Sequence, residues 1–232
     1  MNVRQFRYGQ DNLGYLLYGE REAVAVDGGA SGEMLAFLRE HGLTLRYVTN
    51  THSHGDHTCG NGELLRSTGA EFLDAPALRR TGTVELEGET IRVIETPGHT
   101  ADSVCFLADG MLLSGDTLFM GKVGRCFTGD VRGFYEAIEK LEVLSDETLV
   151  YAGHDYVEEY LDFAAGLEPG NPWIEPYRAR YDPADVVASL GDEKLVDPFL
   201  RLDEPSVVSA LEERGLPAGS RYERWRSLIS LM

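Results

Sequence analysis

The chain of 232 residues lacks a long apolar segment. No run approaches the about 18–20 consecutive apolar residues that a membrane-spanning helix needs. The first residues, MNVRQFRYGQDNLG, lack the hydrophobic region of a secretory signal peptide. We therefore expect a cytoplasmic protein with no membrane partner. Hydrophobic residues make up 43% of the chain, enough for one sizeable core and a small appended unit.

Cysteine is also scarce. The three cysteines, Cys59, Cys105 and Cys126, are an odd number without a paired spacing. This pattern argues against a disulfide framework and fits a reducing compartment.

Positive charge is the third shortage. Lysine and arginine number 21 against 39 aspartates and glutamates, which gives a formal net charge of -18. A surface this negative repels phosphate backbones, so we expect no nucleic-acid partner. The excess of acid does not exclude a local basic pocket.

Short apolar segments separated by turns occupy most of the first 155 residues and predict strands. The candidates are Leu13–Tyr18, Ala23–Asp27, Tyr47–Thr51, Ile91–Thr96, Ser103–Leu107, Met111–Ser114 and Leu149–Ala152. Helical spacing at Gly32–His41 and Val131–Leu144 interrupts them. This order predicts an α+β fold in which packed sheets are flanked by helices.

The pattern changes after about residue 156. Tyr156–Ala165 has helical spacing and is followed by the chain-breaking sequence LEPGNP. Beyond it we find no convincing strand, and Val186–Leu190, Pro205–Arg214 and Tyr222–Leu231 have helical spacing. We predict a first domain over residues 1–160 and a small helical domain over residues 161–232.

The densest chemical motif is THSHGDH at residues 51–57, which begins where the predicted strand Tyr47–Thr51 ends. The alternate spacing of His52 and His54 puts both imidazoles on one side of an extended segment. Gly55 permits a sharp turn, after which Asp56 and His57 can face the same point. So many imidazoles and carboxylates in one pocket call for cations, and two divalent ions would supply the charge. Open catalytic zinc sites favour these ligands, whereas structural sites favour cysteine.

Three further segments each end a probable strand in a glycine-containing turn. They are TPGHT with His99, SGDT with Asp116 and AGHD with His154. Each segment alone is a common turn, but in this order after the histidine-rich motif they predict one metal centre. His41 follows Phe37 by four residues on the apolar face of a predicted helix, so we interpret it as a helical histidine without a metal role.

These motifs resemble the metallo-β-lactamase superfamily over the first 155 or so residues. The resemblance implies an αββα sandwich with two divalent metal ions (Zn, Fe or Mn) at one edge of the sheets. It implies that His52, His54 and His99 bind the first ion, that Asp56, His57 and His154 bind the second, and that Asp116 bridges them. The β-lactamase branch typically has cysteine at the bridging position, so antibiotic hydrolysis is not the expected activity.

Within the superfamily, GDTLFMGKVGRCFTG at residues 115–129, YAGHDY at 151–156 and LDFAAGLEPGN at 161–171 look like glyoxalase II, the hydroxyacylglutathione hydrolases. The similarity continues into DPFLRL at residues 197–202 and the arginine-rich, tryptophan-containing terminus. It implies cleavage of a glutathione thioester such as S-lactoylglutathione, with a helical C-terminal domain that contributes to glutathione binding.

The resemblance also suggests substrate-binding residues. They are Lys122, Arg125, Phe127, Tyr156, Arg221 and Arg224, with Arg226 as a further candidate for the basic pair near the terminus. The family usually has a Lys–Phe–Tyr segment, and here Arg125, Cys126 and Phe127 stand in its place. Arg125 can replace the positive charge with a different geometry, but Phe127 cannot make the tyrosine's hydrogen bond.

The expected mechanism is attack on the thioester carbonyl by a water that the two metals activate. Asp56 orients this water and Asp116 fixes the distance between the metals, so both are candidate catalytic residues.

Three alternatives stay open. A persulfide dioxygenase on this fold would use one Fe(II) ion held by His52, His99 and Asp116. A lactonase or another thioesterase would use the same activated water. A module from another class would bind metal or nucleic acid without catalysis, but the open ligand set and the net charge argue against it.

Overall fold

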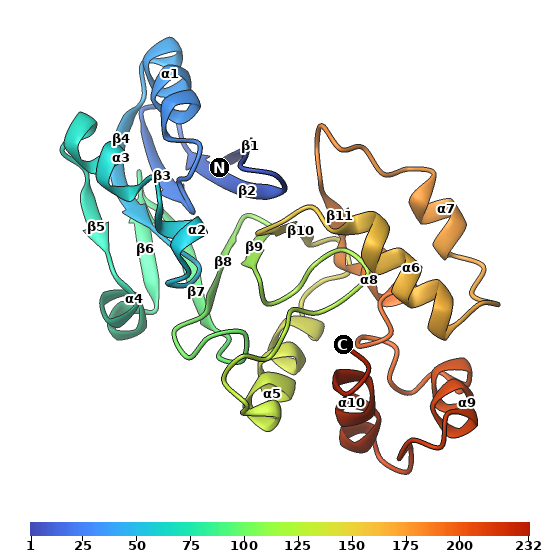
Figure 1. Cartoon of the computed structure of the whole chain (residues 1–232). Helices are drawn as coiled ribbons and strands as arrows, with labels where there is room; N and C mark the ends of the chain where they lie inside the picture. Colours follow the sequence, from blue (N-terminus) through green and yellow to red (C-terminus); the bar gives the residue numbers. More distant parts are fainter.

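The structure, a computed structural model, describes all residues, 1–232, and packs two sheets against each other across a shared core (Figure 1). The first sheet has the order β1-β2-β3-β4-β5 and the second the order β11-β10-β9-β8-β7-β6. The strands of the first sheet are β1 (Asn2–Tyr8), β2 (Asn12–Tyr18), β3 (Glu22–Val26), β4 (Thr44–Thr49) and β5 (Glu71–Leu73). Those of the second are β6 (Thr83–Leu86), β7 (Glu89–Glu95), β8 (Val104–Ala108), β9 (Met111–Gly115), β10 (Leu149–Ala152) and β11 (Ala188–Ser189).

Both sheets are mixed. In the first, β3, β4 and β5 are parallel neighbours, whereas β1 and β2 are antiparallel additions. In the second, only β9 and β10 are parallel. The parallel strands put several carboxyl ends at one edge of the molecule, which is where the candidate ligands lie.

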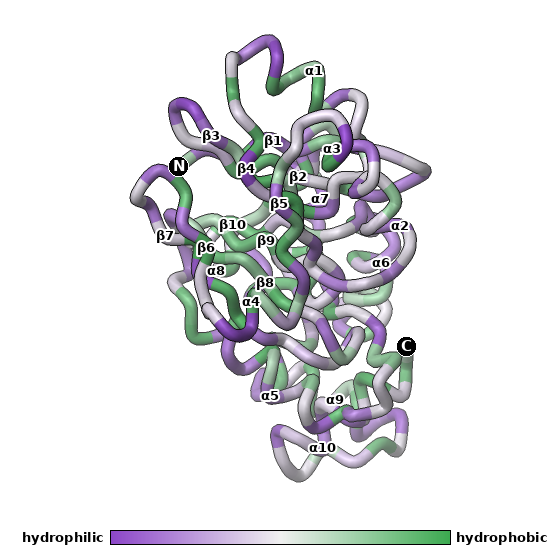
Figure 2. Tube along the Cα trace, turned by 90° about the vertical axis from the view of Figure 1, so that its left-hand side faces the viewer, coloured by the Kyte–Doolittle hydropathy of each residue, from purple (hydrophilic) through white to green (hydrophobic).

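Successive side chains of a strand point to opposite faces of its sheet, which separates the core between the sheets from the outer layers. On β2, Leu13, Tyr15 and Leu17 point into a core shared with the second sheet, whereas Leu16 points to the other face. On β8, Val104 and Phe106 do the same. In Figure 2 the hydrophobic stretches of β8, β9 and β10 run through the middle of the molecule.

Helices cover both outer faces. α1 (Ser31–His41) and α3 (Asn61–Thr68) pack Met34, Leu38 and Leu64 on the first sheet. α5 (Val131–Glu142) packs its apolar side on the second sheet. The predicted αββα sandwich is confirmed. The other helices of this part are α2 (Gly55–Thr58) and α4 (Ala75–Thr81).

The C-terminal part is helical, as predicted. It contains α6 (Val157–Leu167), α7 (Ile174–Arg178), α8 (Leu190–Val196), α9 (Pro205–Glu213) and α10 (Arg221–Ile229). Trp225 of α10 is fully buried and packs edge-on against Phe134 of α5, which joins the helices to the second sheet. None of the helices combines the length and apolarity needed to cross a membrane.

One prediction for this region was wrong. Val186–Leu190 was expected to be helical, but Ala188 and Ser189 form β11 at the edge of the second sheet. The side chain of Gln5, far away in sequence, bonds both the backbone N–H and the carbonyl of Val186. This long-range tether holds the segment extended, against its local spacing.

Candidate metal centre

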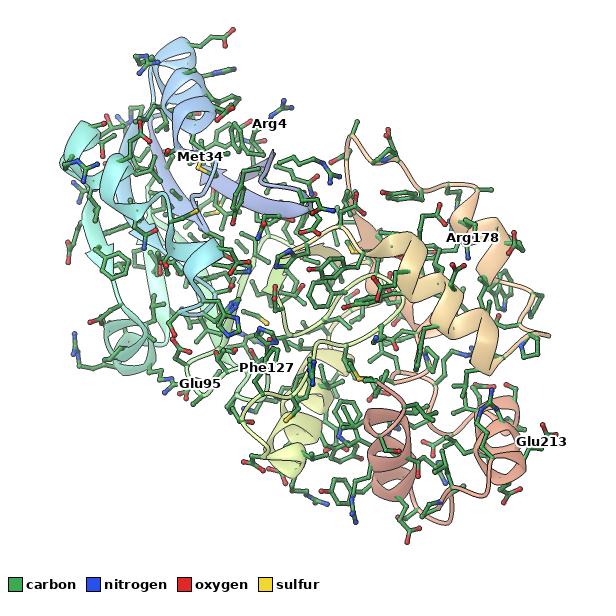
Figure 3. The ribbon with its side chains drawn as sticks, in the orientation of Figure 1. Arg4, Met34, Glu95, Phe127, Arg178 and Glu213 are labelled. Carbon is green, nitrogen blue, oxygen red and sulfur yellow. The ribbon has the colours of Figure 1, made fainter.

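Loops at the carboxyl ends of the strands bring the predicted ligands together. His52 and His54 follow β4, and the short helix α2 then carries Asp56 and His57. His99 follows β7 by four residues, Asp116 comes directly after β9, and His154 follows β10 by two residues. The two sheets therefore both contribute side chains to one centre. Figure 3 shows Phe127 beside a group of side-chain nitrogens in the middle of the molecule.

The first cluster contains His52, His54, His99 and Asp116. His54 Nδ1 lies 2.8 Å from His52 Nε2 and 3.0 Å from His99 Nε2. The Asp116 carboxylate is next to them, with Oδ2 3.3 Å from His99 Nε2. Four potential ligand atoms thus surround one point.

The second cluster contains Asp56, His57 and His154. His57 Nε2 and His154 Nε2 are 3.2 Å apart, and Asp56 Oδ2 lies 3.6 Å and 3.4 Å from them. Asp116 also reaches this cluster, because its Oδ1 lies 3.4 Å from His57 Nε2 and its Oδ2 lies 3.5 Å from His154 Nε2. Asp116 therefore stands between the two clusters.

Outer partners orient four of the five imidazoles. Their Nδ1 atoms face acceptors away from the centre, which leaves Nε2 pointing inward, as is usual for metal-binding histidines. The pairs are His52 with Thr51 Oγ1 at 3.1 Å, His57 with Asp27 Oδ2 at 3.0 Å, His99 with the Arg125 carbonyl at 3.0 Å and His154 with Asp11 Oδ1 at 2.9 Å. His54 is the exception and presents Nδ1.

The electrostatics fit bound cations. Burial lowers the pKa of His52 to about 4, which keeps its ring neutral. Burial opposes ionisation of Asp116, but His154 and His57 hold the pKa of this carboxyl well below its usual range. Neutral imidazole and ionised carboxylate are the forms that bind metal. Asp116 Oδ1 is buried without a hydrogen-bond donor, and ring nitrogens that cannot all be donors face one another.

The pKa of His57 shifts in the opposite direction from that of His52. Burial disfavours its charged form, but Asp27, with further contributions from Asp116 and Asp56, raises the pKa of His57 to about 9. The ring thus attracts positive charge in a fully buried position. A cation at Nε2 would replace the proton there and leave Nδ1–H to face Asp27. Together the two clusters are consistent with a binuclear site.

Two glycines permit the close packing around Asp116. Gly115 has a φ of 50°, and a Cβ there would lie 2.4 Å from Thr51 Oγ1. A Cβ on Gly153 would lie 2.2 Å from Asp116 Oδ1. The Gly153 N–H donates to the Gly115 carbonyl, so β9 and β10 hold these two turns together. The glycines before Asp116 and His154 therefore make room for the centre as well as the turn.

Three of the predicted substrate residues lie at the centre. The Phe127 ring is 58% exposed, and its centroid lies 5.7 Å from that of His54 and 5.2 Å from that of His99. Arg125 stands over Phe127, with its guanidinium 5.2 Å from the ring centroid. Tyr156 stacks on His154 at 5.0 Å with an interplanar angle of 6°. Aromatic rings thus flank both clusters.

Three other predicted substrate residues have partners within the chain. Lys122 is buried, with its ammonium 4.3 Å from the ring centroid of Tyr160. Arg221 forms ion pairs with Glu142 and Asp203, and Arg224 pairs with Asp203 as well. The structure does not bring these three side chains to the His and Asp clusters. Each of them instead satisfies its charge or packing elsewhere in the fold.

The sequence analysis missed the outer partners Asp11, Asn12 and Asp27. Asn12 Nδ2 donates to Asp56 Oδ2 at 2.8 Å, and Asp27 also accepts from both the backbone and the hydroxyl of Thr51. A usable indication was present, since Asp27 ends a predicted strand and two glycines follow it, so it too lies in a glycine-containing turn at a strand end. His41 stacks on Phe37 in α1 and is no part of the centre, as predicted.

Known families match nearly the whole chain. The metallo-beta-lactamase superfamily matches residues 11–73 and 69–154, and the hydroxyacylglutathione hydrolase C-terminus matches residues 155–228. The hydroxyacylglutathione hydrolase of Aliivibrio salmonicida is 35% identical over 221 residues, which cover 88% of each chain. That of Chromohalobacter salexigens is 35% identical over 226 residues and 89% of each chain.

A solved structure agrees over an even larger share of the chain. The crystal structure of ETHE1 from Myxococcus xanthus superposes with a TM-score of 0.72 at 25% identity and covers 99% of this chain and 90% of that one. The architecture, the His and Asp clusters and the two-part match lead to one conclusion: the chain belongs to the metallo-β-lactamase superfamily and, within it, to the hydroxyacylglutathione hydrolase (glyoxalase II) family of metallohydrolases.

Proposed function

We propose that the protein hydrolyses a glutathione thioester, such as S-lactoylglutathione, to glutathione and a hydroxy acid. The observation that carries the proposal is the paired His and Asp clusters with Asp116 between them, in a chain that also has the hydroxyacylglutathione hydrolase C-terminus. No cysteine or serine at the centre is required as a nucleophile, since hydrolysis on a binuclear site proceeds without a covalent intermediate.

The residues that would hold two divalent ions follow the two clusters. His52, His54 and His99 would hold one ion, Asp56, His57 and His154 the other, and Asp116 would bind both. Divalent ions at such a site lower the pKa of water toward neutrality and polarise a carbonyl oxygen. Zn, Fe and Mn all suit this ligand set.

Asp56 is the candidate for orienting the attacking water. Its carboxylate is half exposed, so it faces the open side of the centre, and Asn12 holds one of its oxygens at 2.8 Å. Asn12 is itself buried. Its amide therefore fixes the direction of the carboxylate before substrate arrives, which reduces the reorganisation needed during the reaction.

The thiol half of the substrate would lie along Phe127 and Tyr156, the aromatic rings that flank the clusters. Arg125 has no carboxylate partner within the chain, so its guanidinium is available to a carboxylate of glutathione. A flat Phe127 ring offers contact area but no hydrogen bond. Recognition on this side would therefore depend on stacking and on one charge.

A hydrolysis panel on protein of defined metal content tests the proposal. The substrates are S-lactoylglutathione, a second acyl thioester with a different thiol, and a lactone. We expect the glutathione thioester to have the highest kcat/KM and the activity to be lost with the metal. A higher kcat/KM for the lactone or for the other thioester would overturn the glutathione assignment.

A persulfide dioxygenase is the second candidate. His52, His99 and Asp116 share one cluster and form the two-histidine, one-carboxylate set typical of mononuclear Fe(II) oxygenases. The second cluster and its outer partner Asp11 favour two ions and therefore hydrolysis. Oxygen consumption with glutathione persulfide by the Fe(II) protein, without thioester cleavage, would favour the dioxygenase over the hydrolase.

A further inference from the structure

A tight hairpin at Thr117–Arg125 connects the metal centre with the C-terminal helices; we call it the loop hairpin. Leu118 and Val123 pair across it, the Phe119 N–H donates to the Lys122 carbonyl, and the Gly124 N–H donates to the Thr117 carbonyl. In Figure 1 the chain beyond β9 runs toward α6 and α8. The tip of the loop hairpin thus reaches the C-terminal helices, whereas Asp116 lies at its base.

The tip is buried against two helices. Gly121 has a φ of 84°, and a Cβ there would lie 3.3 Å from Leu161 Cδ2 of α6. Its backbone N–H donates to Glu193 Oε2 of α8 at 2.6 Å. A backbone donor at the tip of a loop is usually satisfied by water, but here a buried side chain takes that place.

Glu193 is a fully buried carboxyl group. Its second oxygen accepts from the hydroxyl of Tyr177 in α7, and no lysine or arginine pairs with it. Burial raises the pKa of Glu193 to about 7. A buried acid without a cation is costly to the fold unless its hydrogen bonds are satisfied, and here both oxygens have a donor.

Both ends of the loop hairpin enter the metal centre. Asp116 directly precedes it, and Gly124 packs so closely on Asp116 that a Cβ would lie 1.8 Å from the Asp116 carbonyl oxygen. At the other end, the Arg125 carbonyl is the acceptor that faces His99 Nδ1 at 3.0 Å. A shift of the tip would therefore move both a carboxylate of the centre and the partner that orients one of its imidazoles.

We propose that Glu193 is a positioning residue: by holding Gly121 at the tip of the loop hairpin, it fixes Asp116 and His99 at the metal centre. The C-terminal helices thereby help to set the geometry of the centre. The kinetic part of this inference rests on the proposed function, whereas its structural part does not.

Hydrogen exchange of the Gly121 amide tests the anchor in the wild-type protein. We expect exchange slowed by about 100-fold or more relative to an unstructured peptide, because the donor is bonded and buried. Exchange at the rate of an open loop would overturn the proposal. This measurement requires neither substrate nor a mutant.

Replacement of Glu193 tests the effect on the centre, with Co(II) as the spectroscopic probe. Glu193→Ala removes the acceptor, and we expect a changed visible spectrum of the Co(II) protein and a loss of about 10- to 100-fold in kcat/KM, the effect typical of outer partners. Glu193→Gln keeps an acceptor for Gly121 and can donate to the Tyr177 oxygen, so it should restore both. Val196→Ala, a buried change on the same helix, is the matched control for loosened packing.

The outcomes separate clearly. A Glu193→Ala spectrum equal to the wild type, the same spectral change in Val196→Ala, or no rescue by Glu193→Gln would each overturn the proposal. If Glu193→Ala does not fold, the exchange of Gly121 in the wild type and in Glu193→Gln decides. Failure of thioester hydrolysis in the wild type would refute the proposed function, but the spectra and the exchange rates would still test the anchor.

Discussion

Four of the five histidines at the centre present the same nitrogen, Nε2, because a neighbouring acceptor takes the other ring nitrogen. Two of these acceptors are carboxylates, Asp27 and Asp11. A carboxylate behind an imidazole fixes its tautomer and raises its basicity as a ligand. The orientation and basicity of the ligand imidazoles thus depend on residues that contact the ligands and do not themselves belong to the two clusters.

Asp11→Ala tests whether the carboxylate that faces His154 Nδ1 supports metal binding. The substitution leaves His154 Nδ1 without its acceptor, so we expect metal affinity at the second cluster to fall by about 10- to 100-fold. Competition with a chelating indicator measures the affinity. Glu213→Ala, an exposed position at the end of α9 on the far side of the C-terminal helices, is the control (Figure 3). Equal affinities in both variants would contradict the role of Asp11.

Asp116→Ala and Asp56→Ala test the two candidate catalytic residues. We expect thioester turnover to fall by more than the about 10- to 100-fold that loss of an outer partner costs, because Asp116 lies between both clusters and Asp56 faces the open side. kcat/KM is measured on protein whose metal content is known. Turnover near that of the wild type in either variant would refute its role.

At the scale of elements, apolar alternation and helical spacing determine what the sequence can predict. β2, β3, β8 and β9 were predicted because they bury side chains on both faces, which gives continuous apolar runs. β1 has the sequence NVRQFRY and no fully buried residue, so it has no apolar run that would predict a strand. Its place at the edge of the sheet follows only from its pairing with β2. β5 and β11 are too short to have a period, and β11 depends on Gln5.

Glu193 of α8 makes the free energy of unfolding depend on pH, which the spacing of residues in the sequence could not indicate. Burial raises the pKa of Glu193 from 4.5 to about 7, so between these values the folded protein binds a proton that the unfolded chain releases. The free energy of unfolding should therefore fall as pH rises through this window. Other titratable groups near Glu193 are Lys122, Asp192 and Asp197. Burial raises the pKa of Asp197, as it does that of Glu193.

Glu193→Gln isolates this contribution, because glutamine does not titrate. We expect the stability of the variant relative to the wild type to increase from pH 5 to pH 8, as the wild-type carboxyl ionises in its buried position. Urea denaturation at both pH values measures the difference. A parallel loss of stability in the two proteins would show that other groups, such as Asp197, dominate.

At the scale of the molecule, a buried ion pair holds the C-terminal helices together. Arg201 makes two hydrogen bonds to Glu168 at the end of α6, at 3.0 and 3.1 Å, and the side chains are 11% and 1% exposed. Arg201→Ala would leave Glu168 buried without its cation, which costs about 3–5 kcal/mol. Arg132→Ala, which removes an exposed pair with Glu136, should cost less than about 1 kcal/mol. Chemical denaturation compares the two, and equal costs would refute the argument.

The candidate ligands could be predicted from the sequence because short motifs carry them. HSHGDH and the three glycine turns each place a ligand type at a strand end, and the fold then collects them. Apart from the adjacent pair Thr51 and His52, the outer partners and the anchor of the loop hairpin join residues that are 24 to 143 positions apart, as in Thr51 with Asp27 and His154 with Asp11. Such contacts leave no local pattern, so only the structure reveals them.

The order of the ligands along the chain has a consequence for biosynthesis. Every member of the first cluster precedes residue 117, whereas the second cluster needs His154, which follows the α5 crossover between β9 and β10. A nascent chain leaves the ribosome from its N-terminus, and its earlier segments can fold first. The donors for one ion are thus complete while those for the other are still being made. On the proposed two-ion site, the second ion could be captured only after His154 has been made, just before α6, the first helix that packs on the loop hairpin.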